Sequence, residues 1–279
     1  MKLNKIAIVA CSNPITDSTN FEALKDILKD IGIDFISSKF ILNNTDILNR
    51  DNSKMADEIL EFFKDSSIDA IFDISGGDLA NSILPYLNFE EIKKYPKPFF
   101  GYSDLTVLLN ALYTKSDITT YNYQLLNLVK DKSKTQIKNF KATFNEENSS
   151  LFDFKYEFIK GDSLEGVLVG GNIRCLLKLS GTPYMPDFKN KVLFLESFSG
   201  NPYKILTFLN QIRDMDILKN LKGILIGSFT EMDNNNYIPS VNQMILKITE
   251  NHNIPIAVTK EIGHQPLSKC IKIGNYIKL

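Results

Sequence analysis

The stretch PKPFFGYSDLTVLLNALY, residues 96–113, predicts a short strand, a sharp turn and a helix in direct succession. The strand covers residues 98–102, Ser103 lies in the turn, and the helix covers residues 105–113. Almost every residue of this helix is apolar, and a helix without a polar face is buried among other elements. The stretch therefore belongs to the interior of a layered α/β protein.

The same succession recurs on both sides of this stretch. We predict further strands at residues 6–10, 33–36, 68–74, 166–169, 191–195, 223–226 and 254–258, a last alternating stretch at 270–279, and helices at 21–31, 172–179, 203–212, 241–250 and after Ser53, which would cap its helix. Strands that alternate with helices form βαβ units and a mostly parallel sheet. From about residue 130 to residue 163 the chain is polar without a strong period, which predicts a linker or a lid, with or without edge strands.

The bulk composition excludes several classes of protein. The 279 residues include 32 Lys and Arg against 33 Asp and Glu, so no general positive field exists to hold nucleic acid or an anionic membrane. No stretch approaches the roughly 20 apolar residues of a membrane span, and the apolar run at 6–10 is shorter than a signal peptide's core of about 7–15 residues. Cys11, Cys175 and Cys270 form neither a disulfide framework nor a metal-binding pair. We therefore expect a soluble, cytoplasmic protein.

Ser103 is a candidate nucleophile. In a nucleophile elbow, a Ser between a strand and a helix holds its hydroxyl clear of the sheet, beside the free backbone N–H groups of the helix start. These groups and the helix dipole stabilise an oxyanion. The alternative is that Ser103 or Asp104 only caps the helix, and Leu105 stands where the G-x-S-x-G motif has its second Gly.

The sequence SGGD at residues 75–78 also follows a strand and opens a helix. Paired glycines let backbone N–H groups approach a ligand closely, which suits an oxyanion hole or a phosphate loop. Neither the P-loop pattern nor the G-x-G-x-x-G pattern is present, so nucleotide binding has little support. The alternative is a tight turn between a strand and a helix.

An acid and a base follow later strands. Glu196 ends the apolar strand at 191–195, at the kind of position where catalytic groups gather in α/β sheets, although it is equally a solvated loop residue by sequence alone. The chain has two histidines: His252 lies at a polar helix end, whereas His264 lies in the turn IGHQP. A serine nucleophile needs a base, and the base needs an acid, so Ser103, His264 and Glu196 together predict a serine hydrolase.

These motifs together resemble those of the LD-carboxypeptidase family of serine peptidases, which includes the microcin C immunity peptidases. The similarity covers nearly the whole chain and rests on IAIVACSNP at 6–14, SGGD at 75–78, LPYL at 84–87, PKPFFGYSDLT at 96–106, GGN at 170–172, LSGTP at 179–183, LFLE at 193–196, GH at 263–264 and IG at 273–274.

The resemblance implies a fold and a site. Residues 1–125 would form a flavodoxin-like domain with a mostly parallel sheet, residues 126–163 a linker, and residues 164–279 a smaller α/β domain. Ser103 would be the nucleophile, His264 the base and Glu196 the acid that orients it. The backbone N–H groups of Gly77 and Asp104 would form the oxyanion hole. We expect the site to lie between the two domains.

The resemblance also implies the chemistry. The enzyme would be a hydrolase that cuts an amide bond at the C-terminal end of a small peptide, either a murein tetrapeptide or a peptidyl-nucleotide antibiotic, with no cofactor or metal and as a homodimer. The sequence differs from the family at Ser197, at Gln265 and in the segment TYNYQ at 120–124, which affects the pocket rather than the three catalytic candidates. A different reading is an α/β binding module that keeps the fold and lacks activity.

The two histidines give the first test. His264→Ala removes the base and should abolish turnover of a murein tetrapeptide or a peptidyl-sulfamoyl adenylate, whereas His252→Ala should leave it nearly intact. The rate of the unsubstituted enzyme should show a pH limb set by an imidazole, whose ordinary pKa is about 6.5. Loss of activity in the His252 variant instead would identify a different base.

Overall fold

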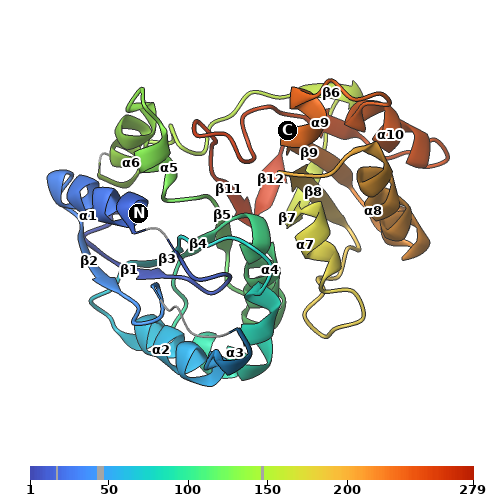
Figure 1. Ribbon diagram of the computed structural model, residues 1–279. Coiled ribbons are helices and arrows are strands. Elements are labelled where there is room, and N and C mark those ends of the chain that lie inside the picture. Colours follow the sequence, from blue (N-terminus) through green and yellow to red (C-terminus); the bar gives the residue numbers. More distant parts are fainter. Residues whose placement is uncertain (17, 43–46, 146–147) are drawn as a thin grey trace.

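A computed structural model describes residues 1–16, 18–42, 47–145 and 148–279. The chain forms two α/β halves that lie side by side, each built on a six-stranded sheet with helices on its faces (Figure 1). This architecture confirms the predicted α/β class. None of the described helices is long and apolar enough to cross a membrane.

The first sheet has the strand order β11-β5-β4-β3-β1-β2. Its strands are β1 (Lys5–Val9), β2 (Asp34–Ser37), β3 (Ala70–Asp73), β4 (Phe99–Gly101), β5 (Thr120–Asn122) and β11 (Ile271–Ile273). Strands β1 to β5 are parallel, and their order is that of flavodoxin-like folds, as predicted. Strand β11 runs antiparallel to β5, so the C-terminal part of the chain completes the first sheet.

The helices of the first half have apolar faces at the predicted spacing. They are α1 (Thr19–Asp30), α2 (Asn52–Lys64), α3 (Phe89–Ile92) and α4 (Thr106–Ser116), with short 3-10 turns at Ile47–Asn49, Ala80–Tyr86 and Ser103–Leu105. The predicted cap of α2 was wrong: Asp51, not Ser53, accepts a hydrogen bond from the Lys54 backbone at 3.0 Å. An Asp and a Ser two positions apart are both good caps, so their order alone does not decide the helix start.

The second sheet has the order β12-β7-β8-β9-β10-β6. Its strands are β6 (Glu157–Lys160), β7 (Glu165–Asn172), β8 (Lys191–Ser197), β9 (Gly223–Phe229), β10 (Ile256–Val258) and β12 (Tyr276–Lys278). The helices of this half are α7 (Ile173–Leu177), α8 (Pro202–Asp214), α9 (Thr230–Asn234) and α10 (Val241–Ile248), with a 3-10 turn at Ile217–Asn220. Strands β7 to β10 are parallel, and both edge strands are antiparallel to their neighbours. Glu196, the candidate acid, lies at the carboxyl end of β8.

The polar segment 126–163 has regular structure of its own. It contains α5 (Asn127–Lys130), α6 (Thr135–Asn145) and the edge strand β6. Helix α6 packs Phe140 and Phe144 into the core of the first half, whereas β6 pairs with β10 in the second sheet. Phe140 and Phe144 thus anchor the connection to the first half, while the domain boundaries at 125 and 164 stay a prediction.

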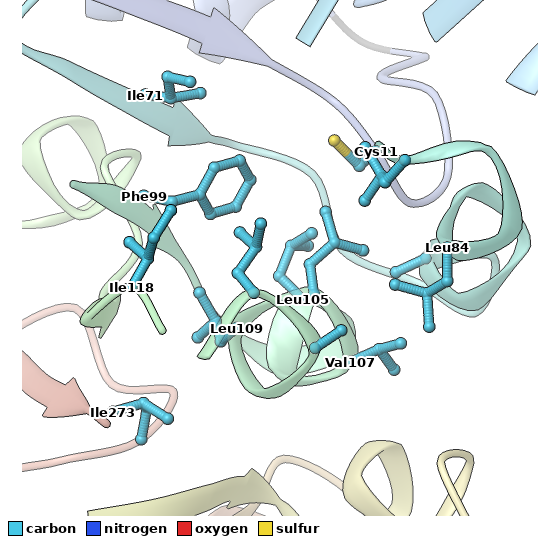
Figure 2. Packing of buried hydrophobic residues seen from close by; sticks show 14 of the residues in the cluster. Cys11, Ile71, Leu84, Phe99, Leu105, Val107, Leu109, Ile118 and Ile273 are labelled. Atoms are coloured by element: carbon cyan, nitrogen blue, oxygen red, sulfur yellow. The ribbon is translucent and has the colours of Figure 1, made fainter. Parts of the chain in front are cut away.

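Helix α4 lies between the two sheets (Figure 1) and contacts β5 on one side and β7 and α7 on the other. Its residues from Thr106 to Leu112 are all buried, which explains its lack of a polar face. Figure 2 shows Leu105, Leu109 and Phe99 of the surrounding core, together with Ile273 from the C-terminal end of the chain. The core is therefore continuous across both halves.

Asn110 joins α4 to β7 through a pair of amide hydrogen bonds. Its Nδ2 donates to the Gly170 carbonyl at 2.8 Å, and its Oδ1 accepts from the Gly170 N–H at 2.9 Å. Asn110→Ala leaves both buried groups of Gly170 without a partner, so the free energy of unfolding in urea should fall by about 2–4 kcal/mol. The control Asn235→Ala, which loses one exposed bond to Glu231, should change it by less than about 0.5 kcal/mol. Equal decreases in the free energy of unfolding of the two variants would mean that Asn110 does not stabilise the contact between α4 and β7.

Candidate active site

Ser103 lies at the carboxyl end of β4 with a backbone φ of 57°. A non-glycine residue in this left-handed region is uncommon and costs about 1–3 kcal/mol, and such strain concentrates at functional sites. Gly101 makes the turn possible, because a Cβ there would lie 2.8 Å from the Leu105 Cβ. The Ser103 hydroxyl makes no hydrogen bond to any described residue, so it is free to meet a ligand.

Glu196 and His264 form a buried pair. Glu196 is the penultimate residue of strand β8 and is 1% exposed. Its Oε2 is 2.7 Å from Nδ1 of His264, whose side chain is 5% exposed. The second oxygen, Oε1, accepts a hydrogen bond from Asn172 Nδ2 at 3.1 Å. Because the carboxylate faces Nδ1, this nitrogen carries the proton in the neutral imidazole and Nε2 is the acceptor.

The loop that carries His264 is held on both sides. The Gly263 N–H donates to the Ser268 hydroxyl at 2.9 Å, and the Ser228 hydroxyl donates to Oε1 of Gln265 at 2.9 Å. Gly263 has a φ of 154°, and a Cβ at this position would collide with the Ser228 hydroxyl. Glycine before the histidine is therefore required by the close approach of β9.

The His264 ring contacts two aromatic rings. Its centroid is 4.7 Å from that of Tyr102, the residue before Ser103, and 5.1 Å from that of Phe198. Burial, together with the nearby Glu196 charge, raises the pKa of Tyr102 to about 12, so this phenol stays neutral beside the imidazole. The contact with Tyr102 brings the Glu196–His264 pair of the second half next to the serine turn of the first.

The hydrogen bond that a triad predicts between Ser103 and His264 is not formed. Nε2 of His264 is buried and has no partner among the described residues. The His264 ring is held by Glu196, Tyr102 and Phe198, whereas the Ser103 hydroxyl has no partner among the described residues that orients it. Catalytic hydrogen bonds are often loose without substrate. A buried nitrogen without a partner is rare and calls for a functional explanation.

The candidate oxyanion donors lie on adjacent loops. Gly77 has a φ of 129°, and the Asn13 side chain fills the space where a Cβ would stand, 2.2 Å away. Asp104 follows Ser103 as the second residue of the 3-10 turn Ser103–Leu105. In the part of the chain that the structure describes, neither backbone N–H has an acceptor, so both remain available to a ligand.

Two residues of the site, Asn172 and Phe198, were not predicted from the sequence. Asn172 ends β7 after two glycines, and a polar residue at the end of a buried strand was a usable signal. Nothing in the sequence marked Phe198 as a neighbour of His264. Among the described residues, no group of three or more His, Cys, Asp or Glu side chains is arranged to hold a metal ion.

A flavodoxin-like half, a strained serine turn and a buried carboxylate–imidazole pair are together the features of an α/β serine hydrolase. Residues 6–123 match the LD-carboxypeptidase N-terminal domain, and residues 165–279 match the LD-carboxypeptidase C-terminal domain. The chain therefore belongs to the LD-carboxypeptidase family and is a serine peptidase of that type.

Individual proteins are similar to this chain in sequence or in fold. The probable murein peptide carboxypeptidase of Bacillus subtilis (strain 168) is 29% identical, and the match covers 98% of this chain and 88% of that protein. The crystal structure of an MccF-like protein from Bacillus anthracis is 26% identical with a TM-score of 0.84, covering 100% of this chain and 93% of the other. The microcin C7 self-immunity protein MccF, solved in complex with aspartyl sulfamoyl adenosine, is 18% identical with a TM-score of 0.85, covering 100% and 94%.

The contact between Asn172 and Glu196 gives a prediction. Asn172→Ala removes the donor to Oε1 and frees the carboxylate to turn away from His264. A hydrogen bond to a charged group is worth about 1.5–3 kcal/mol, so kcat should fall about 10- to 100-fold. Initial rates with a murein tetrapeptide or a peptidyl-sulfamoyl adenylate measure this, with Asn235→Ala as the control. An unchanged kcat would mean that Glu196 needs no second partner.

Proposed function

We propose that this peptidase hydrolyses an amide bond at the C-terminal end of a small peptide with a catalytic triad of Ser103, His264 and Glu196. The observation that carries the proposal is the 2.7 Å Glu196–His264 contact, which leaves a buried, unpartnered Nε2 beside the residue that precedes Ser103. This arrangement supplies an oriented base to a serine that otherwise has no activating group.

The reaction follows from these groups. When a substrate enters, Nε2 of His264 takes the Ser103 proton, and Oγ attacks the scissile carbonyl. The carbonyl oxygen becomes an oxyanion that accepts hydrogen bonds from the Gly77 and Asp104 N–H groups. Glu196 stabilises the imidazolium, which then protonates the leaving amine. A water molecule activated by His264 releases the acyl group and restores Ser103.

A cavity of about 410 Å³ lies at the carboxyl ends of β9 and β10, next to the His264 loop, but Ser103, Glu196 and His264 do not line it. Ser228 lines it and also holds Gln265, the residue after His264. The B. subtilis relative supports a murein peptide as substrate, and the MccF complex supports a peptidyl nucleotide.

We also propose that the enzyme acts in the cytoplasm as a homodimer. All three cysteines, Cys11, Cys175 and Cys270, are free and buried, which fits a reducing compartment. The dimer is an expectation from the family, and light scattering on the purified chain measures it.

Ser103→Ala tests the proposal. The variant should stay folded and lose several orders of magnitude in kcat, because the members of a triad act as a unit. Incubation with a murein tetrapeptide and, separately, with a peptidyl-sulfamoyl adenylate, followed by mass spectrometry, identifies which amide is cut. Ser149→Ala, an exposed serine paired with Asp153, is the control. Cleavage by Ser103→Ala at the rate of the unsubstituted enzyme would remove Ser103 from the mechanism.

A further inference from the structure

The carboxylate of Asp104, the residue after the nucleophile, is wholly buried and receives three hydrogen bonds. Oδ2 accepts from the Ser12 hydroxyl at 2.6 Å and from the Ala80 N–H at 2.8 Å. Oδ1 accepts from the ammonium group of Lys178, which lies directly after α7 and is 19% exposed. An ionised carboxylate inside a protein requires this kind of pairing. Asp104 therefore ties the serine turn to Ser12, to Ala80 just after the loop at 75–78, and to Lys178 of the second half.

Arg174 in the first turn of α7 and Lys178 directly after this helix also hold the loop at 75–78, here called the oxyanion loop. Lys178 Nζ donates to the Asp78 carbonyl at 2.9 Å. Arg174 of α7 donates to the Gly77 carbonyl at 3.1 Å and forms an ion pair with the Asp78 carboxylate. Two cations from the second half thus bind both carbonyls of the Gly77–Asp78 segment.

Asn13 binds the peptide groups before and after Gly77, from the side opposite to Arg174 and Lys178. The Asn13 N–H donates to the Gly76 carbonyl at 3.2 Å, and Asn13 Oδ1 accepts from the Asp78 N–H at 3.0 Å. In a trans peptide the C=O and N–H point in opposite directions. With the Gly76 carbonyl bound to Asn13, the Gly77 N–H points away from Asn13 and has no partner among the described residues.

We infer that Arg174 and Lys178 are positioning residues that hold the oxyanion loop against the serine turn, so that the N–H groups of Gly77 and Asp104 converge on one oxyanion. The inference rests on the proposed function. Neither cation touches the reacting atoms; each acts through the carbonyls of Gly77 and Asp78 or through the Asp104 carboxylate.

Arg174→Gln is the first test, because its side chain is 40% exposed and its loss leaves no buried charge. We expect kcat to fall about 10- to 100-fold, since about 1 Å of misplacement costs on the order of a hundredfold. KM should hardly change, because oxyanion donors act on the transition state rather than on the bound substrate. The control is Arg213→Gln on α8, which breaks an exposed ion pair with Asp214.

Lys178→Met is the second test, with circular dichroism to verify folding. Its kcat should fall at least as far as that of Arg174→Gln, and the rate at which a fluorophosphonate labels Ser103 should fall in parallel. A purely structural role would lower the melting temperature of both variants and leave kcat and the labelling rate of the folded protein unchanged. That outcome would overturn the inference, and if Lys178→Met does not fold, the Arg174→Gln result alone decides.

Failure of the inference and failure of the proposed function give different results. Labelling of the unsubstituted enzyme but not of Ser103→Ala supports the function whatever the two cation variants do. If labelling depends on Ser103, but Arg174→Gln and Lys178→Met are labelled at the normal rate, only the positioning role is rejected. No labelling of the unsubstituted enzyme would reject the proposed function itself, and the inference with it.

Discussion

The contact between the segment 170–178 and the first half is the constraint on which the site depends. Gly170 binds Asn110 of α4, and Asn172 donates its backbone N–H to Thr106 at 2.9 Å and its side chain to Glu196. Arg174 and Lys178 then reach the oxyanion loop and Asp104. Four residues of this nine-residue segment therefore contact the nucleophile helix, the acid and the oxyanion loop, and they fix the two halves against each other.

The site contains conformations and charges that are costly in isolation. Ser103 is in the left-handed region, and the carboxylates of Glu196 and Asp104 are buried. Each strained residue costs about 1–3 kcal/mol, and a buried charge without partners costs more. They persist because α4 packs on both sides into one continuous apolar core and because each carboxylate has two or more donors. This burial keeps the donors and the imidazole fixed before substrate arrives.

The sequence predicted most of the strands and helices and the candidate serine, acid and base, because apolar periodicity and strand ends depend on local patterns; it missed β5, α3, α6 and α9. It did not predict that β11 joins the first sheet or that α6 packs on it, since these are pairings between distant segments. The missing Ser103–His264 hydrogen bond and the roles of Arg174 and Lys178 had no sequence signal. A surface-type cation becomes a positioning residue only through its contacts in the folded chain.

The most direct test of the central claim is to locate the covalent adduct. After reaction with a fluorophosphonate, the purified protein is digested and the modified peptide is sequenced by tandem mass spectrometry. We expect one adduct, on Ser103, because the proposed base His264 has a buried, unpartnered Nε2 and packs against Tyr102, the residue before Ser103. A stoichiometric adduct on any other residue, with Ser103 unmodified, would contradict it.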